Sequence, residues 1–180
     1  MTSTDRATRF AVMGPSRAGK TSVARQLAEG WTTVHGMIDP VRALCTAAGV
    51  RPTRANLIWC AQPFRSLGGE GALARVAVAA SAGVLDGVRL ESEVQVLRAE
   101  NVQLVYVDTP LSVREERRFR DRDVWVPQFD AEAEALREQA DWTVSGVGGD
   151  EALIEALRMM GELGHQVGAA DHPAKLAIAG

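Results

Sequence analysis

One eight-residue segment near the start of the chain has the residue types and the spacing of a phosphate-binding loop. It reads GPSRAGKT from Gly14 to Thr21 and fits the pattern GxxxxGK[ST]. Glycine at both ends permits a backbone in which successive N–H groups point at phosphate oxygens. Lys20 would reach the β and γ phosphates, and Thr21 would offer its hydroxyl to Mg²⁺. The segment therefore predicts a site for ATP with Mg²⁺.

The residues around this loop favour a strand before it and a helix after it. Arg9 to Met13 (RFAVM) is a short apolar run, and Thr21 to Glu29 has the spacing of an amphipathic helix. A helix that begins near Lys20 adds the positive end of its dipole to the phosphate site. The residues expected to bind the nucleotide are Gly14, Ser16, Arg17, Ala18, Gly19, Lys20, Thr21 and Ser22.

A second candidate site lies in the segment VLDGVR, which runs from Val84 to Arg89. Asp86 follows a short apolar strand, the position from which a carboxylate holds the magnesium shell in nucleotide-binding proteins of this kind. We select it as a metal-binding and catalytic residue; the alternative is a simple Asp-Gly turn. Arg89 is a candidate for binding an anionic group of the acceptor, or else a solvated arginine at a helix start.

Five arginines follow the apolar run Val102 to Asp108, within residues 110–123. Arg114, Arg117 and Arg118 share one helical face by their spacing. Such a helix predicts a lid that excludes water from the transferring phosphate, and we select Arg114 and Arg118 as candidate catalytic residues. Several acids are interleaved, so an exposed helix with salt bridges is the alternative.

Two further positions are candidates for the acceptor side. Asp39 follows the second expected strand and is a candidate for orienting or deprotonating the acceptor; it is equally a candidate N-cap with Pro40 at the first helical position. Arg65 is a candidate anion clamp, with Trp59 and Phe64 as a stacking surface. Ordinary core packing is the alternative for the two aromatic residues.

Strands alternate with helices along the chain, which predicts an α/β fold. Ser112 with Glu115 has the pattern of a capping box, and Asp130 and Asp150 are expected to be N-caps. Residues 165–180 are expected to form a tail. The remaining expected strands are 31–35, 83–86, 102–108 and 142–145, and the remaining expected helices are 40–48, 53–61, 71–80, 90–99, 113–122, 131–140 and 151–163.

Composition places limits on the class of protein. The 180 residues, 46% of them hydrophobic, suit one globular domain. Cys45 and Cys60 lack the spacing of a metal site and are expected to be reduced thiols. No apolar run is long enough for a membrane span or a signal peptide, so we expect a cytoplasmic protein. The net charge of -3 disfavours non-specific binding to nucleic acid, although residues 36–82 hold five arginines and two acids.

Five segments, in this order, resemble the nucleoside monophosphate kinase branch of P-loop proteins, especially phage-type deoxynucleoside monophosphate kinases and dephospho-CoA kinases. They are GPSRAGKT, MIDPVRALCTAAG, VLDGVRLESEVQVLR, VYVDTPLSVREERRFRDRD and ADWTVSGVGGDEALIEAL. The resemblance spans about residues 9–163, and only the first segment is highly specific. It implies a three-layer fold with a five-stranded parallel sheet in the order 2-3-1-4-5. It also implies a single kinase domain over residues 1–164, with an acceptor-binding insertion at 36–82 and a lid at 111–128.

The resemblance further implies that the loop after the last strand borders the adenine, which assigns Gly146 to the nucleotide site. Many relatives have an asparagine there, whereas this chain has Ser145-Gly146-Val147-Gly148, so any contact to the base is mainly through the backbone. The expected activity is transfer of a phosphoryl group from ATP to a (deoxy)nucleoside monophosphate.

Two other functions remain open at this stage. Phage kinases that phosphorylate hydroxymethyluracil in DNA are similar to the same branch, which keeps a base in DNA as an alternative acceptor. The other alternative is a P-loop nucleotide-binding switch without catalysis. The NKxD motif of GTPases is absent from the sequence, and the chain is short for an oligomeric motor.

Overall fold

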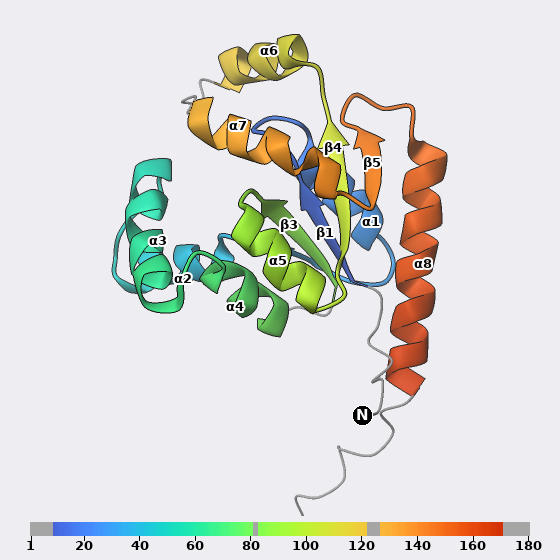
Figure 1. The fold of residues 1–180 in the computed structure, drawn as a ribbon, viewed down its shortest axis with the longest axis horizontal. Coiled ribbons are helices and arrows are strands. Elements are labelled where there is room, and N and C mark those ends of the chain that lie inside the picture. Colours follow the sequence, from blue (N-terminus) through green and yellow to red (C-terminus); the bar gives the residue numbers. More distant parts are fainter. Residues whose placement is uncertain (1–8, 81–82, 122–126, 171–180) are drawn as a thin grey trace, which may run out of the picture.

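Five parallel strands form one sheet in the order β2-β3-β1-β4-β5, as expected (Figure 1). The computed structural model describes residues 9–80, 83–121 and 127–170. The strands are β1 (Phe10–Met13), β2 (Val34–Gly36), β3 (Val84–Val88), β4 (Gln103–Asp108) and β5 (Trp142–Ser145).

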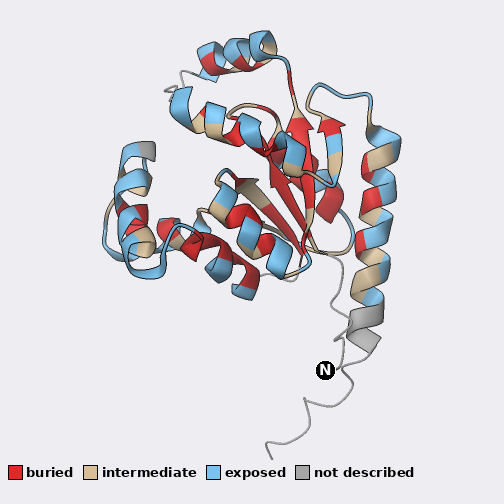
Figure 2. Ribbon diagram, viewed as in Figure 1, coloured by how far each residue is buried: buried red, intermediate tan, exposed pale blue. Residues whose placement is uncertain are grey.

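Helices cover both faces of this sheet, which gives the three layers of an α/β fold. Alternate residues of β1 enter opposite cores: Ala11 and Met13 pack beneath α4, α5 and η1, whereas Phe10 and Val12 pack beneath α1 and α8. The central strands are buried almost throughout, and the helices are buried on one side only (Figure 2). The helical elements are α1 (Lys20–Ala28), α2 (Asp39–Ala47), α3 (Arg54–Gly68), α4 (Ala72–Ala80), α5 (Glu91–Ala99), α6 (Leu111–Asp121), α7 (Pro127–Ala135), the 3₁₀ helix η1 (Leu136–Gln139) and α8 (Glu151–Ala170).

The segment between β2 and β3 contains three helices, α2, α3 and α4. They share a small core of their own, apart from the two cores on the sheet. Both cysteines are free and buried in this core. Its buried residues are Val41, Cys45, Cys60, Ala61 and Leu73.

Several element boundaries differ from those expected: for example, β3 continues to Val88, α6 begins at Leu111, and the helix expected over 131–140 is replaced by the end of α7 and by η1. β2 begins only at Val34, since Trp31 instead covers the end of α1 and donates from Nε1 to the carbonyl of Leu27 at 2.6 Å. α3 continues through Pro63 to Gly68. α8 continues to Ala170, so the first residues of the expected tail are helical, while residues 171–180 lie outside the described part of the chain.

The expected helix caps also need correction. Ser112 lies inside α6, and Asp130 lies inside α7, which begins at Pro127 because proline suits the first turn of a helix. Asp39 is the first residue of α2, with Ile38 in the N-cap position. Asp150 does precede α8, and its carboxylate accepts the N–H of Ser145 at 2.5 Å. Capping residues in the sequence therefore indicate that a helix begins nearby, but they locate its first residue only to within a few positions.

Two further expectations concern the lid and membrane-spanning segments. Residues 122–126 of the expected lid lie outside the described residues. Among the helices of the described ranges, none is long and apolar enough to cross a membrane.

Candidate active site

The glycine-rich loop connects β1 to α1 in the manner expected of a phosphate-binding loop. Gly14 has a φ of 136°, and a β-carbon there would lie 2.9 Å from the carbonyl oxygen of Val107. Arg17 also has a positive φ, 64°, which is uncommon for a residue with a side chain and occurs at functional loops. Some backbone N–H groups that were expected to bind phosphate instead form hydrogen bonds within the protein: the N–H of Ala18 donates to Pro15 O, and that of Ser22 donates to Gly19 O.

Lys20 lies at the first turn of α1 with only 8% of its surface exposed. Its Nζ donates to the carbonyl oxygen of Pro15 at 2.6 Å. Burial, and next the nearby charge of Arg89, lower the pKa of Lys20 to about 7, while Asp86 and Asp130 act in the opposite direction. A lysine in this environment gains its full charge readily when an anion arrives.

Thr21 of α1 and Asp86 of β3 are in direct hydrogen-bond contact. Thr21 Oγ1 donates to Asp86 Oδ2 at 2.7 Å, because β3 lies beside β1 in the sheet. Asp86 Oδ1 is buried and has no hydrogen-bond partner among the described residues. An orphaned carboxylate oxygen beside a hydroxyl fits Mg²⁺ or a water that it carries.

The described ranges contain no group of three or more His, Cys, Asp and Glu residues that could hold a metal ion. Mg²⁺ would therefore be held by one carboxylate, one hydroxyl, phosphate oxygens and water, which is how it binds at most nucleotide sites.

A cavity of about 880 Å³ begins at this loop and extends between α3, α5 and α7. At the nucleotide end, Gly146 belongs to its lining, and a β-carbon there would collide with the carbonyl oxygen of Ala18. The segment after β5 thus lies directly on the phosphate-binding loop, where the resemblance assigns the adenine. The residues that line this end include Gly19, Lys20, Thr21, Arg117, Ser145, Gly146 and Gly148.

The other end of the cavity combines charged and apolar groups. Arg65 lines it, and its Nε is buried without a hydrogen-bond partner in the described ranges. Arg89 lines it too, at the end of β3. Apolar lining comes from Met37, Ile38, Leu57, Ile58, Ala61, Leu73, Leu90 and Phe129.

Glu93 is a lining residue that sequence reasoning missed. It is 4% exposed, and its Oε2 accepts the N–H groups of Arg89 at 2.9 Å and Leu90 at 3.2 Å. Burial raises the pKa of this carboxyl above its ordinary value, while the two N–H donors and the nearby arginines oppose the rise. The available signal was its place at the third position of a helix, where a glutamate can bond back to the chain.

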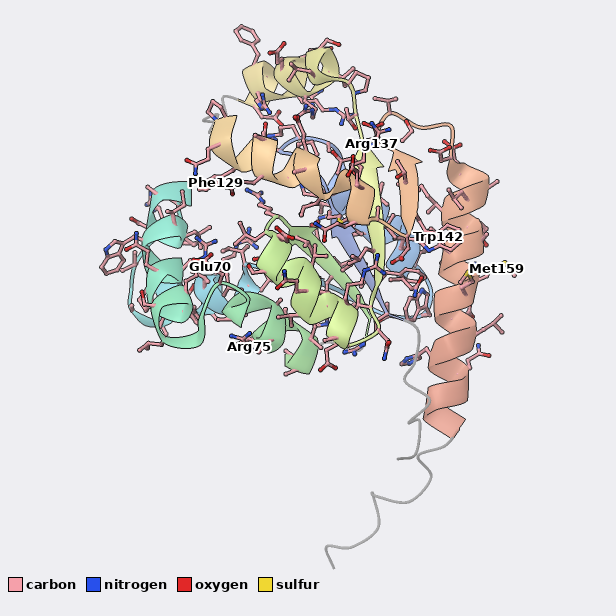
Figure 3. All side chains as sticks on the ribbon, in the orientation of Figure 1. Glu70, Arg75, Phe129, Arg137, Trp142 and Met159 are labelled. Carbon is pink, nitrogen blue, oxygen red and sulfur yellow. The ribbon has the colours of Figure 1, made fainter. Side chains whose placement is uncertain are left out.

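The expected stacking surface beside Arg65 is not where the sequence placed it. Trp59 is 67% exposed and does not line the cavity. Phe64 packs against the small core of α2, α3 and α4. The aromatic side chain at the cavity is instead Phe129 of α7, labelled in Figure 3.

Asp39 is also outside the cavity lining. Its Oδ2 accepts the N–H of Gly36 at 2.6 Å, and its Oδ1 pairs with Arg42 at 2.8 Å. These bonds fix the turn between β2 and α2. The side chain is half exposed at the rim of the site.

The arginines of α6 separate into two sets. Arg114 and Arg118 are buried and do not line the cavity; both pair with Asp130 of α7. Arg117 and Arg120 do line it. Arg117 donates to the carbonyl oxygens of Arg17 at 3.0 Å and Gly146 at 2.9 Å, and so bridges the two segments at the nucleotide end.

Comparisons with known proteins identify the fold. No protein-family model and no curated protein matches this sequence. A shikimate kinase from Aquifex aeolicus matches with a TM-score of 0.55 and 18% identity, over 92% of this chain and 99% of that one. A tunicamycin resistance protein from Deinococcus radiodurans matches with a TM-score of 0.53 and 19% identity, over 97% of this chain and 100% of that one. A gluconokinase from Sinorhizobium meliloti 1021 matches with a TM-score of 0.50 and 15% identity, over 92% of this chain and 95% of that one.

These similarities extend over nearly the whole chain, and the sheet order agrees with them. The chain therefore has the α/β fold of P-loop kinases.

Proposed function

We propose that this chain transfers the γ-phosphoryl group of ATP to a small nucleotide-like acceptor, with a (deoxy)nucleoside monophosphate as the first choice. The observation that carries the proposal is one continuous cavity that extends from Lys20 and Thr21 to Arg65, whose buried Nε has no hydrogen-bond partner among the described residues. A donor site and an anion-binding acceptor site in one cavity are what phosphoryl transfer between two nucleotides requires.

Each residue of the loop has a distinct role in this proposal. Lys20 stabilises the negative charge on the β and γ phosphates, and this charge redistributes as the phosphoryl group moves. Thr21 and Asp86 would hold Mg²⁺, which neutralises phosphate charge when bound. The acceptor oxygen attacks the γ phosphorus, the bond to the β-γ bridging oxygen breaks, and ADP leaves.

The acceptor end offers a cation and an apolar surface side by side. Arg65 can bind a phosphate with two donors, and Phe129 with the neighbouring aliphatic side chains can cover a base. Arg89 lines the same cavity, and its positive charge helps to lower the pKa of Lys20 and opposes the rise in the pKa of Glu93. A compact dianion with a flat apolar part fits this lining.

A carboxylated polyol is a second candidate acceptor. The observation in its favour is that one guanidinium such as Arg65 binds a carboxylate as well as a phosphate. The matched structures include a shikimate kinase and a gluconokinase, whose names imply such acceptors for those proteins.

A panel of acceptors tests these candidates. The protein is incubated with labelled ATP, Mg²⁺ and, in turn, nucleoside monophosphates, dephospho-CoA, shikimate, gluconate and DNA that contains hydroxymethyluracil. Label on a nucleotide supports the proposal, and label only on a polyol acid or on DNA replaces it. Affinity for DNA that falls steeply with salt would mark a polymer acceptor. Slow ATP hydrolysis without transfer would favour a nucleotide-binding switch.

The side chain of Arg65 gives a prediction about the acceptor alone. Replacing it by alanine is expected to raise the acceptor KM by about tenfold or more, since a hydrogen bond to a charged group contributes about 1.5–3 kcal/mol. The KM for ATP should change by less than about twofold. Steady-state kinetics with the acceptor found in the panel measures both.

Arg75→Ala is the matched control for this prediction. Arg75 is an exposed arginine of α4 that bonds to the carbonyl of Gly68 and does not line the cavity; Figure 3 labels it on the outer side of the helix. Equal effects of the two substitutions would mean that only the overall charge of the α2–α4 segment matters.

The lowered pKa of Lys20 predicts that ATP binding is accompanied by proton uptake at pH 8. With a pKa of about 7, the side chain is mostly neutral at pH 8, and a bound triphosphate favours its charged form and raises that pKa. Binding of ATP at pH 8 should therefore take up about one proton per site, and the uptake should shrink toward pH 6. Titration calorimetry in buffers of different ionisation enthalpy measures this number. No uptake at pH 8 would contradict the expected contact between Lys20 and the phosphates.

A further inference from the structure

A buried carboxylate connects α7 to the phosphate-binding loop and to α6. Asp130 of α7 is 6% exposed. Its Oδ1 accepts the backbone N–H of Ser16 at 2.8 Å. Its Oδ2 pairs with Nη1 of Arg114 at 3.5 Å and with Nη2 of Arg118. One side chain thus holds three groups from two distant parts of the sequence.

Asp130 is a counter-charge that both arginines share. Arg114 has two further partners, the carbonyl oxygen of Thr109 at 3.2 Å from Nε and Glu134 Oε1 at 2.5 Å from Nη2. Both guanidinium groups are buried, so removing the negative charge of Asp130 would leave their positive charge less compensated in the interior. α6 would then shift to bring at least one of them to water.

The placement of α6 matters to the cavity because of a residue on its other side. Arg117 lies one position before Arg118 and points to the nucleotide end, where it bonds to Arg17 O and Gly146 O. Its guanidinium can span these two carbonyl groups only while α6 stays against the loop. Asp130 itself does not line the cavity.

We propose that Asp130 is a positioning residue for nucleotide binding: it fixes α6 against the phosphate-binding loop, so that Arg117 bridges the two segments, at Arg17 and Gly146, that line the nucleotide end of the cavity. This inference rests on the proposed function, because it takes the nucleotide end of the cavity as the ATP site. Asp130, which does not line the cavity, acts through two neighbours, Ser16 and α6.

A double-mutant cycle on ATP binding tests the inference. Titration calorimetry gives the Kd of ATP with Mg²⁺ for the parent, Arg117→Ala, Asp130→Asn and the double variant, at a temperature where circular dichroism shows all four folded. Arg117→Ala is expected to weaken ATP binding by about fivefold or more in the parent and by less than about twofold when Asp130 is already asparagine. If Asp130 had a merely structural role, Asp130→Asn would lower the melting temperature, but Arg117→Ala would weaken ATP binding by the same factor with and without Asp130→Asn.

Glu134→Gln supplies the matched control background. Glu134 pairs with Arg114 as Asp130 does, but it is half exposed and, within the described part of the chain, forms no hydrogen bond or ion pair with the phosphate-binding loop. Arg117→Ala should keep its full effect in that background. The inference would be overturned if Arg117→Ala weakened ATP binding equally in the parent and in the Asp130→Asn background. It would also be overturned if Arg117→Ala did not weaken ATP binding in the parent. A parent that binds no ATP would instead overturn the proposed function.

Discussion

Lys20→Ala is expected to lower kcat/KM for phosphoryl transfer by about 100- to 1000-fold or more while the chain remains folded. The lysine is the only side chain of the loop that brings a positive charge directly to the β and γ phosphates in the proposed mechanism. Alanine leaves the backbone of the loop intact but supplies nothing to follow the developing charge. Single-turnover transfer of label from ATP measures the loss.

The fold is expected to tolerate this change for a physical reason visible in the site. Burial lowers the pKa of Lys20 to about 7, far below its unfolded value of 10.5. A group whose pKa is lowered by folding binds fewer protons in the native state between these two values, so stability rises with pH from about 7 to 10.5. Replacing Lys20 by alanine removes the free-energy cost of burying its charge at neutral pH. The melting temperature should therefore be unchanged or higher.

Arg25→Ala serves as the control for Lys20→Ala. Arg25 lies on the same helix, α1, in its last turn, and is exposed outside the cavity. It should retain the parent's activity. Turnover of Lys20→Ala equal to that of the parent at saturating ATP would contradict the proposed phosphate site.

The parts of the fold that sequence predicted well depend on local signals. The loop GPSRAGKT follows a short apolar strand, and the acid of VLDGVR lies within another; such strands are recognisable by their composition alone, although β3 continues two residues beyond Asp86, to Val88. The strand order came from the resemblance to a kinase branch, and the sheet confirms it. The meeting of Thr21 with Asp86 follows from that order, since β3 lies beside β1.

The roles of the arginines on α6 could not be predicted, because spacing fixes only their relative directions. Successive residues of a helix differ by about 100°, so Arg117 and Arg118 point well apart while Arg114 and Arg118 differ by only about 40°. Which direction faces the cavity depends on the tertiary contacts of the helix. Asp130 of α7 decides it by pairing with Arg114 and Arg118, which leaves Arg117 to the nucleotide end.

Asp130 and Glu93 escaped sequence reasoning for a related reason. Each is an acid near a helix start, where capping is the common role. Asp130 instead lies one turn further inside α7 because the helix begins at Pro127. Glu93 does bond to the start of α5, but its second feature, a place in the cavity lining, depends on α3 lying opposite.

Asp86→Asn is the second substitution from which we expect a large effect, a loss of about 100-fold or more in the rate of transfer, with a higher Mg²⁺ concentration needed for half-maximal rate. An amide can still accept the hydroxyl of Thr21, as Oδ2 does now, so the fold should persist. It cannot supply negative charge at the buried Oδ1, which lacks a partner among the described residues. Magnesium titrations of the rate for parent and variant provide the measurement.

Asp108→Asn distinguishes a metal role of Asp86 from the general effect of losing an acid in a strand of the sheet. Asp108 ends β4, pairs with Arg137 at 2.6 Å and does not line the cavity. Substitution of Asp108 should leave the magnesium dependence of the rate unchanged, because a carboxylate outside the cavity cannot contact an ion that is bound to the phosphates. If Asp86→Asn instead gave the same magnesium titration as the parent, Asp86 would serve only to order Thr21, and Mg²⁺ would depend on phosphate, hydroxyl and water ligands alone.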